Sequence, residues 1–159
     1  MSKSCFFIGH KDAPAAIRSL LSEAIERHIT EYGVTEFYMG HYGAFDYMAA
    51  GVLTEMKERY PQIKANMLLA YHPAVRQVDI PKGLDGSILL DGQEKSHPRY
   101  AITNLNKHMV RESDYLIAYV RYITAGSHKL LDYAIKKEKK GQLVITNLAD
   151  SLPDAKEFL

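Results

Sequence analysis

Short apolar runs alternate with segments of helical period along almost the whole chain. The runs suit buried strands and are SCFFIG (4–9), TEFYMG (35–40), IKANMLLAY (63–71), DYLIAYV (114–120) and QLVITNL (142–148). Between them the spacing of the apolar residues predicts helices over residues 13–32, 45–60 and 127–139. Strands that alternate with helices form a mostly parallel sheet covered on both faces. The pattern therefore predicts an α/β, Rossmann-like three-layer fold with a mostly parallel sheet of about five strands.

The stretch HPAVRQVDIPKGLDGSILLDGQEKSHPRY (72–100) interrupts this alternation. It carries three prolines and three glycines and has no sustained period, although SILL (87–90) suits a short strand. A helix is predicted after it, at about 101–112. Long irregular segments in compact domains are often functional, which makes this one a candidate lid or interface. A solvated connector is the alternative interpretation.

Composition limits the class of protein. A chain of 159 residues with 47% hydrophobic content suits one domain, residues 1–159, with a sizeable core. Twenty basic and nineteen acidic side chains leave a net charge of +1, which disfavours a nucleic-acid partner. The single Cys5 cannot form an internal disulfide, and no apolar run suits a secretory signal or a membrane span. We therefore expect a cytoplasmic, soluble protein without membrane contact.

Four strand-to-helix loops are predicted at the carboxyl edge of the sheet, where open α/β sheets bind ligands. They cover residues 9–11, 40–44, 71–73 and 122–128. Glycine permits close approach of the backbone, and the free amides of a helix start bind anions. TAGSHK (124–129) is the clearest case, because it places amides, a hydroxyl and Lys129 at one helix start. Each glycine alone could serve only the turn, so the prediction of a binding site depends on the convergence of these loops.

Other familiar motifs are absent from the sequence. Gly40 and Gly43 lack the third glycine of the dinucleotide fingerprint, and there is no P-loop. The seven histidines show no ligand spacing such as HExxH, so we expect no metal and no other cofactor. Cys5 lies inside a predicted buried strand, where a cysteine more often packs than reacts.

Three motifs stand at the ends of predicted strands: GHK (9–11), GHYGAFD (40–46) and AGSHK (125–129). With their flanking residues they resemble the YpsA-like branch of the SLOG superfamily, which includes the Lonely Guy phosphoribohydrolases and the DNA-processing protein A domain. The resemblance spans most of the chain outside 72–100. It implies a Rossmann-like domain that binds a nucleotide or nucleotide-derived small molecule along the strand ends.

The resemblance also implies roles for individual residues. The first turn of the family matches Gly9 and His10, the second matches Gly43 and Asp46, and the phosphate-binding turn matches Gly126 and Ser127. Lys11 and Ala125 depart from the family, which commonly has arginine and glycine there. Lonely Guy enzymes carry a glutamate three residues after their threonine, where this chain has Leu130. The nearest carboxylate, Asp132, should point elsewhere on the helix.

These inferences lead to three hypotheses of function. The first is a sensor or regulatory domain that binds a nucleotide, with Leu130 arguing against an enzyme. The second is an N-glycosidase or deoxyribosyltransferase with Asp46 as its candidate catalytic group. The third is a nucleic-acid module, and self-association into a homo-oligomer is left open. The candidate ligand-binding residues are Gly9, His10, Lys11, Gly40, His41, Tyr42, Gly43, Asp46, Tyr71, Gly126, Ser127 and Lys129.

Gly43 provides a direct test of this interpretation. If its φ is ordinary and negative and a ligand lies against it, Gly43→Ala should leave stability near that of the wild type or slightly raised, and weaken binding. If its φ is positive, stability should fall by about 1 kcal/mol and the test no longer discriminates.

Overall fold

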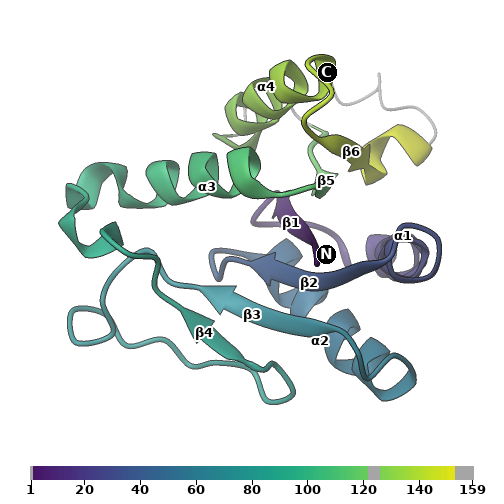
Figure 1. The fold of residues 1–159 in the computed structure, drawn as a ribbon, viewed down its shortest axis with the longest axis horizontal. Helices are drawn as coiled ribbons and strands as arrows, with labels where there is room; N and C mark the ends of the chain where they lie inside the picture. Colours follow the sequence, from purple (N-terminus) through teal and green to yellow (C-terminus); the bar gives the residue numbers. More distant parts are fainter. Residues whose placement is uncertain (1, 122–125, 153–159) are drawn as a thin grey trace.

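The computed structural model describes residues 2–121 and 126–152, where strands and helices alternate (Figure 1). The strands are β1 (Lys3–Gly9), β2 (Val34–Met39), β3 (Lys64–Leu68), β4 (Gly86–Ile88), β5 (Tyr115–Tyr119) and β6 (Val144–Asn147). The helices are α1 (Arg18–Thr30), α2 (Ala44–Arg59), α3 (Ala101–Glu112) and α4 (Gly126–Lys139). Short 3₁₀ turns lie at Ala15–Ile17, Gln93–Lys95, Pro98–Tyr100 and Leu148–Ser151.

The described strands form one parallel sheet in the order β4-β3-β2-β1-β5-β6. This confirms the α/β, Rossmann-like prediction, with six strands instead of about five. The extra strand is β4, which overlaps the first two residues of the SILL run and pairs its Ile88 with Leu68 of β3. The chain order reverses at β1, because β2 pairs on one side of it and β5 on the other. Such a reversal is the place where open α/β sheets bind ligands.

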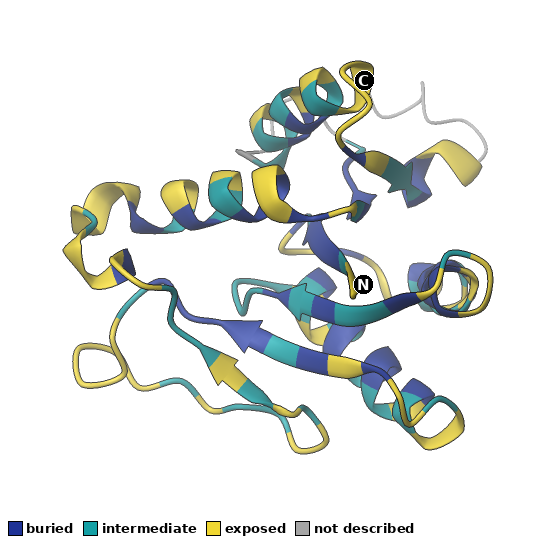
Figure 2. Cartoon of the chain, in the orientation of Figure 1, coloured by how far each residue is buried: buried dark blue, intermediate teal, exposed yellow. Residues whose placement is uncertain are grey.

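The central strand is buried because both of its faces are apolar. Cys5 and Phe7 face the core that α1 and α2 cover, whereas Phe6 and Ile8 face the core that α3 and α4 cover. Burial raises the pKa of the Cys5 thiol, which suits packing better than reactivity. Figure 2 shows the consequence, since the inner strands are largely buried and the outer surfaces of the helices are exposed.

The segment 72–100 is anchored at both ends. The buried amide of Gln93 donates from Nε2 to the carbonyl of Ala70 (3.1 Å) and to that of Ala101 (2.8 Å). The hydroxyl of Tyr71 donates to the carbonyl of Pro98 (3.0 Å). The segment therefore returns to its starting point, and its middle part runs over the surface, where Figure 2 shows much of it exposed.

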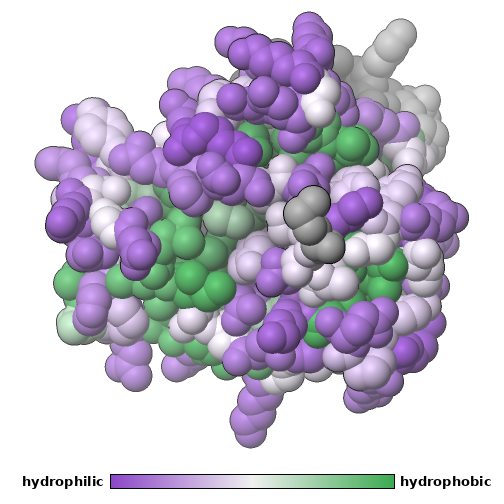
Figure 3. Space-filling model, viewed as in Figure 1, coloured by the Kyte–Doolittle hydropathy of each residue, from purple (hydrophilic) through white to green (hydrophobic). Residues whose placement is uncertain are grey.

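Hydrophobic residues gather on the face of the molecule between α3 and the strands β3 and β4 (Figure 3). Ile88, Leu90 and Ile102 pack here against the core of α3 and α4. In residues 2–121 and 126–152, no helix is long and apolar enough to cross a membrane.

Candidate functional site

A cleft of about 1140 Å³ lies at the reversal of strand order. Its walls come from the carboxyl end of β1, the turn after β2 and the facing sides of α3 and α4. Eight of the twelve predicted ligand-binding residues line it: Gly9, His10, Lys11, Gly40, Tyr42, Asp46, Ser127 and Lys129. The convergence of the loops is therefore present in the structure, although it does not by itself show a ligand.

His10 joins the ends of the two central strands. It is 4% exposed, and its Nε2 accepts a hydrogen bond from the backbone N–H of Arg121 (2.7 Å), just beyond β5. Burial lowers its pKa, with Asp12 acting in the opposite direction, so the imidazole is neutral at pH 7. A neutral imidazole has one N–H, and with Nε2 as the acceptor this proton is on Nδ1.

The Nδ1 of His10 lies 3.3 Å from the hydroxyl oxygen of Ser127, in the first turn of α4. With its proton on Nδ1, His10 donates to that oxygen, and Ser127 keeps its own O–H to donate elsewhere. Gly126 begins the helix, and residues 122–125 of the predicted loop lie outside the described part of the chain. A hydroxyl donor at a helix start, aligned with the positive end of the helix dipole, suits an anion.

Charged residues line the whole length of this cleft. They are Lys11, Lys107, Lys129 and Lys136, together with Asp12, Asp46 and Asp132. Lys107 and Lys136 were not predicted, because nothing in the sequence indicated that α3 and α4 face each other across a cleft. In the described residues, no group of histidine, cysteine and carboxylate side chains could hold a metal ion.

Asp46 is the carboxyl group with the most unusual environment. Burial raises its pKa to about 6, and the hydrogen bond that its Oδ2 accepts from the N–H of Tyr42 (3.1 Å) opposes this shift only in part. Asp46 also lies in the first turn of α2, where its negative charge suits the helix dipole, and its bond holds the turn that precedes the helix. Its carboxyl group can therefore act as a proton donor or acceptor near neutral pH.

The glycines of the two turns make room for the protein itself. A Cβ on Gly43 would lie 2.5 Å from the Cα of Lys11, and Gly43 lines neither pocket described here. A Cβ on Gly9 would lie 2.4 Å from the ring of Phe45. With φ at 173°, Gly43 has extended backbone. This contact contradicts the expectation that Gly43→Ala leaves stability near that of the wild type, because the added Cβ would clash with the backbone of Lys11.

Gly40 differs from Gly9 and Gly43, since it borders both the cleft and the carboxyl group of Asp46. A Cβ there would lie 3.1 Å from Oδ2 of Asp46, so the missing side chain lets that carboxyl group sit beside the cleft.

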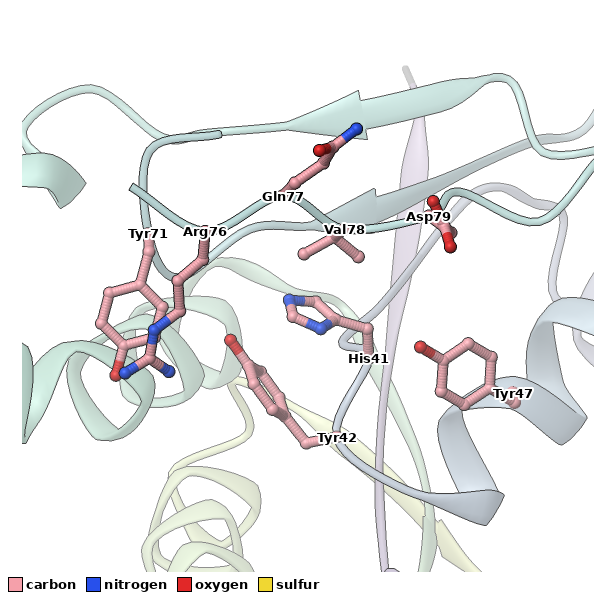
Figure 4. Close-up of a pocket in the computed structure, with 8 residues that line it drawn as sticks. All are labelled: His41, Tyr42, Tyr47, Tyr71, Arg76, Gln77, Val78 and Asp79. Atoms are coloured by element: carbon pink, nitrogen blue, oxygen red, sulfur yellow. The ribbon is translucent and has the colours of Figure 1, made fainter. Parts of the chain in front are cut away.

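A second pocket, of about 320 Å³, lies beyond Tyr42 (Figure 4). It contains the predicted His41, Tyr42 and Tyr71 and is completed by Tyr47, Arg76, Gln77, Val78 and Asp79. The segment 76–79 belongs to the irregular stretch that was a candidate lid or interface, and here it forms one wall. Tyr47 was missed because its position next to Asp46 looked like ordinary helix surface.

Leu130 lies in the wall of the large cleft, at the position where Lonely Guy enzymes have a glutamate. Asp132 also borders this cleft, contrary to the expectation that it points elsewhere, because the cleft extends along α4. Its carboxylate lies 3.4 Å from Nδ1 of His128, and its side chain is 58% exposed.

No protein-family model matches this chain, and no curated protein sequence matches it. The α/β fold with its strand reversal and the two adjoining pockets therefore carry the functional argument.

Proposed function

We propose that the large cleft binds the phosphate and sugar of a nucleotide or nucleotide-derived small molecule. The observation that carries this proposal is the His10–Ser127 pair, which leaves a hydroxyl donor at the start of α4 inside the cleft. Lys129 and Lys11 border the same space and supply positive charge. The carboxyl group of Asp46 suits the hydroxyl groups of a ribose, which can donate to it.

The motifs shared with the YpsA-like branch of the SLOG superfamily support this proposal, and we propose that the protein belongs to that superfamily. Leu130 cannot transfer a proton, which favours a sensor or regulatory domain over a phosphoribohydrolase. The single cysteine fits a cytoplasmic location.

A thermal-shift series with nucleotides, ribose 5-phosphate and inorganic phosphate tests the proposal, because a ligand that binds only the folded state raises the melting temperature. Ser127→Ala and Lys129→Ala should reduce the shift, measured for each variant against its own ligand-free melting temperature, because Ser127→Ala also removes the acceptor of the His10 hydrogen bond. Lys139→Ala is the matched control, since this lysine is exposed at the far end of α4. If no phosphorylated compound stabilises the wild type at millimolar concentration, the proposal fails.

A second candidate function is N-glycosidase or deoxyribosyl transfer, which the raised pKa of Asp46 favours. The test is release of free base from nucleoside monophosphates, followed by chromatography. Activity in the wild type that disappears in Asp46→Asn, while nucleotide binding remains, would support this function. The absence of base release from purine and pyrimidine substrates would remove it.

A further inference from the structure

The small pocket and the large cleft adjoin at one side chain. Tyr42 lines both of them, and its backbone N–H is held by Asp46, which lies on the cleft side. The turns that form these sites follow β1, β2 and β3, which are neighbours in the sheet. Neighbouring strands are about 4.8 Å apart, so a ligand that crosses these strand ends spans about 10 Å. An extended nucleotide has a comparable length.

The lining of the small pocket indicates what kind of group fits it. The ring centroids of His41 and Tyr42 lie 4.1 Å apart. Figure 4 shows the hydroxyl of Tyr47 pointing toward His41. The volume of about 320 Å³ is at the lower end of the range for ligand pockets, which suits one ring system and not a whole nucleotide.

The charged residues of the small pocket argue against an aromatic site for a free cation such as a quaternary ammonium group. The guanidinium of Arg76 already lies over the ring of Tyr71, 4.1 Å from its centroid. Asp79 provides one opposite charge, so the charged side chains of the lining cancel. Burial lowers the pKa of His41, which keeps its imidazole neutral at pH 7. An uncharged aromatic ring with hydrogen-bonding edges fits this environment better than a free ammonium group.

The Tyr42 hydroxyl adds a polar group beside this space. Its oxygen is buried and makes no hydrogen bond with the described residues; the backbone of Ala70 influences its pKa without reaching hydrogen-bonding geometry. Burial, followed by the nearby Tyr71, raises the pKa of Tyr42 to about 12. The phenol therefore keeps its proton at neutral pH, so the aromatic wall that Tyr42 provides is uncharged.

The geometry points to the small pocket as a nucleobase subsite, with Tyr47 and the 76–79 segment as its open walls and Tyr42 as the partition toward the sugar. This inference rests on the proposed function, because it assumes that the large cleft holds the phosphate and ribose. In this arrangement the phosphate lies over the end of β1 beside the start of α4, the ribose lies beside Asp46, and the base lies over the end of β3. The segment 76–79 then determines which base the protein accepts.

Calorimetric titration with ribose 5-phosphate and with the four common nucleoside monophosphates separates the two subsites. In the wild type, the tightest nucleotide should bind at least about tenfold more strongly than ribose 5-phosphate, as expected for one stacked base. Tyr47→Ala should remove most of this ratio and leave the affinity for ribose 5-phosphate unchanged. Tyr100→Ala is the matched control, because this tyrosine is also exposed and lines neither pocket.

The possible outcomes distinguish the inference from the function on which it rests. If ribose 5-phosphate and all four nucleotides bind equally, the base subsite is overturned and the proposed phosphate site remains. Equal nucleotide affinity in the wild type and Tyr47→Ala also overturns it, as does stabilisation by tetramethylammonium ion without any gain from a base. If neither the sugar phosphate nor any nucleotide binds, the proposed function and the base subsite fall together.

Discussion

Gly43 and Lys11 pack backbone against backbone, so that a Cβ on Gly43 would lie 2.5 Å from the Cα of Lys11. The N–H of Ala44 donates to the carbonyl of Lys11 (2.8 Å), which holds the two turns together. The turn after β2 is therefore fixed by the turn after β1. Both turns contribute to the cleft, so this contact fixes the position of Asp46 relative to His10.

Gly43→Ala should destabilise the protein by about 1–3 kcal/mol, because the added methyl group forces the backbone of Lys11 to move. Denaturant unfolding monitored by circular dichroism measures this change. Gly51→Ala is the control, since it lies inside α2 and its Cβ would meet only the Arg18 side chain at 3.7 Å. That variant should gain about 0.5–1 kcal/mol from helix propensity. Equal stability of Gly43→Ala and the wild type would contradict the packing described here.

Asp46→Asn should change how stability depends on pH. The folded-state pKa of Asp46 is raised from 3.8 to about 6, so between these values the folded protein holds more protons than the unfolded chain. The contribution of Asp46 to the free energy of unfolding therefore falls as pH rises from about 4 to about 7. A shift of about two pKa units corresponds to at most about 3 kcal/mol, and the amide of the variant does not ionise.

The measurement is the difference in unfolding free energy between Asp46→Asn and the wild type at pH 4 and at pH 7.5. The unfolding free energy of the variant should increase relative to that of the wild type as pH rises. The contributions of other titrating groups are the same in both proteins and cancel in this difference. Asp132→Asn serves as the control for the chemical change alone, because it replaces a carboxyl group by an amide at a mostly exposed side chain. A constant difference for Asp46→Asn would mean that its carboxyl group is well solvated.

His10 should titrate below its usual pKa of 6.5, with its proton on Nδ1 when neutral. Nitrogen-15 chemical shifts of the ring, followed from pH 8 to pH 5, give both the pKa and the tautomer. Protonation also disrupts the bond from Arg121, so the contribution of His10 to stability is lost as pH falls below 6.5. A proton on Nε2 at pH 8 would overturn the assigned direction of the bond to Ser127.

Gln93→Leu should cost about 2–4 kcal/mol, because it leaves the carbonyl groups of Ala70 and Ala101 without their donor in a buried place. Hydrogen exchange should become faster across 72–100 and stay unchanged in β1 and β5. Gln142→Leu provides a comparison at an exposed glutamine, where stability should stay within about 0.5 kcal/mol. Unchanged exchange in the segment would show that Gln93 does not anchor it.

The alternation of apolar runs and helical periods was enough to predict the fold, because strands such as β1 are buried on both faces and helices such as α3 are not. The pattern also placed His10, Asp46 and Ser127 at one edge of the sheet, since carboxyl ends of parallel strands meet there. Local sequence carries this information directly.

Other parts of the two pockets depend on tertiary packing that no local pattern reports. Lys107 borders the cleft because α3 lies opposite α4, and Arg76 lines the small pocket from the irregular segment 72–100, whose path no local pattern predicts. The role of Gly43 was misjudged for the same reason. A glycine in a turn looks alike in the sequence whether it makes room for a ligand or for Lys11.

The bond between His10 and Arg121 joins groups that are 111 positions apart in the chain. At a synthesis rate of about 5–20 residues per second, Arg121 is made roughly 6–22 s after His10. Strands β1 to β4 can pair during this interval, but the wall that α4 adds to the cleft does not yet exist. A nascent chain therefore folds its first half without the Ser127 and Lys129 side of the cleft, and a ligand gains these contacts only once synthesis has passed α4.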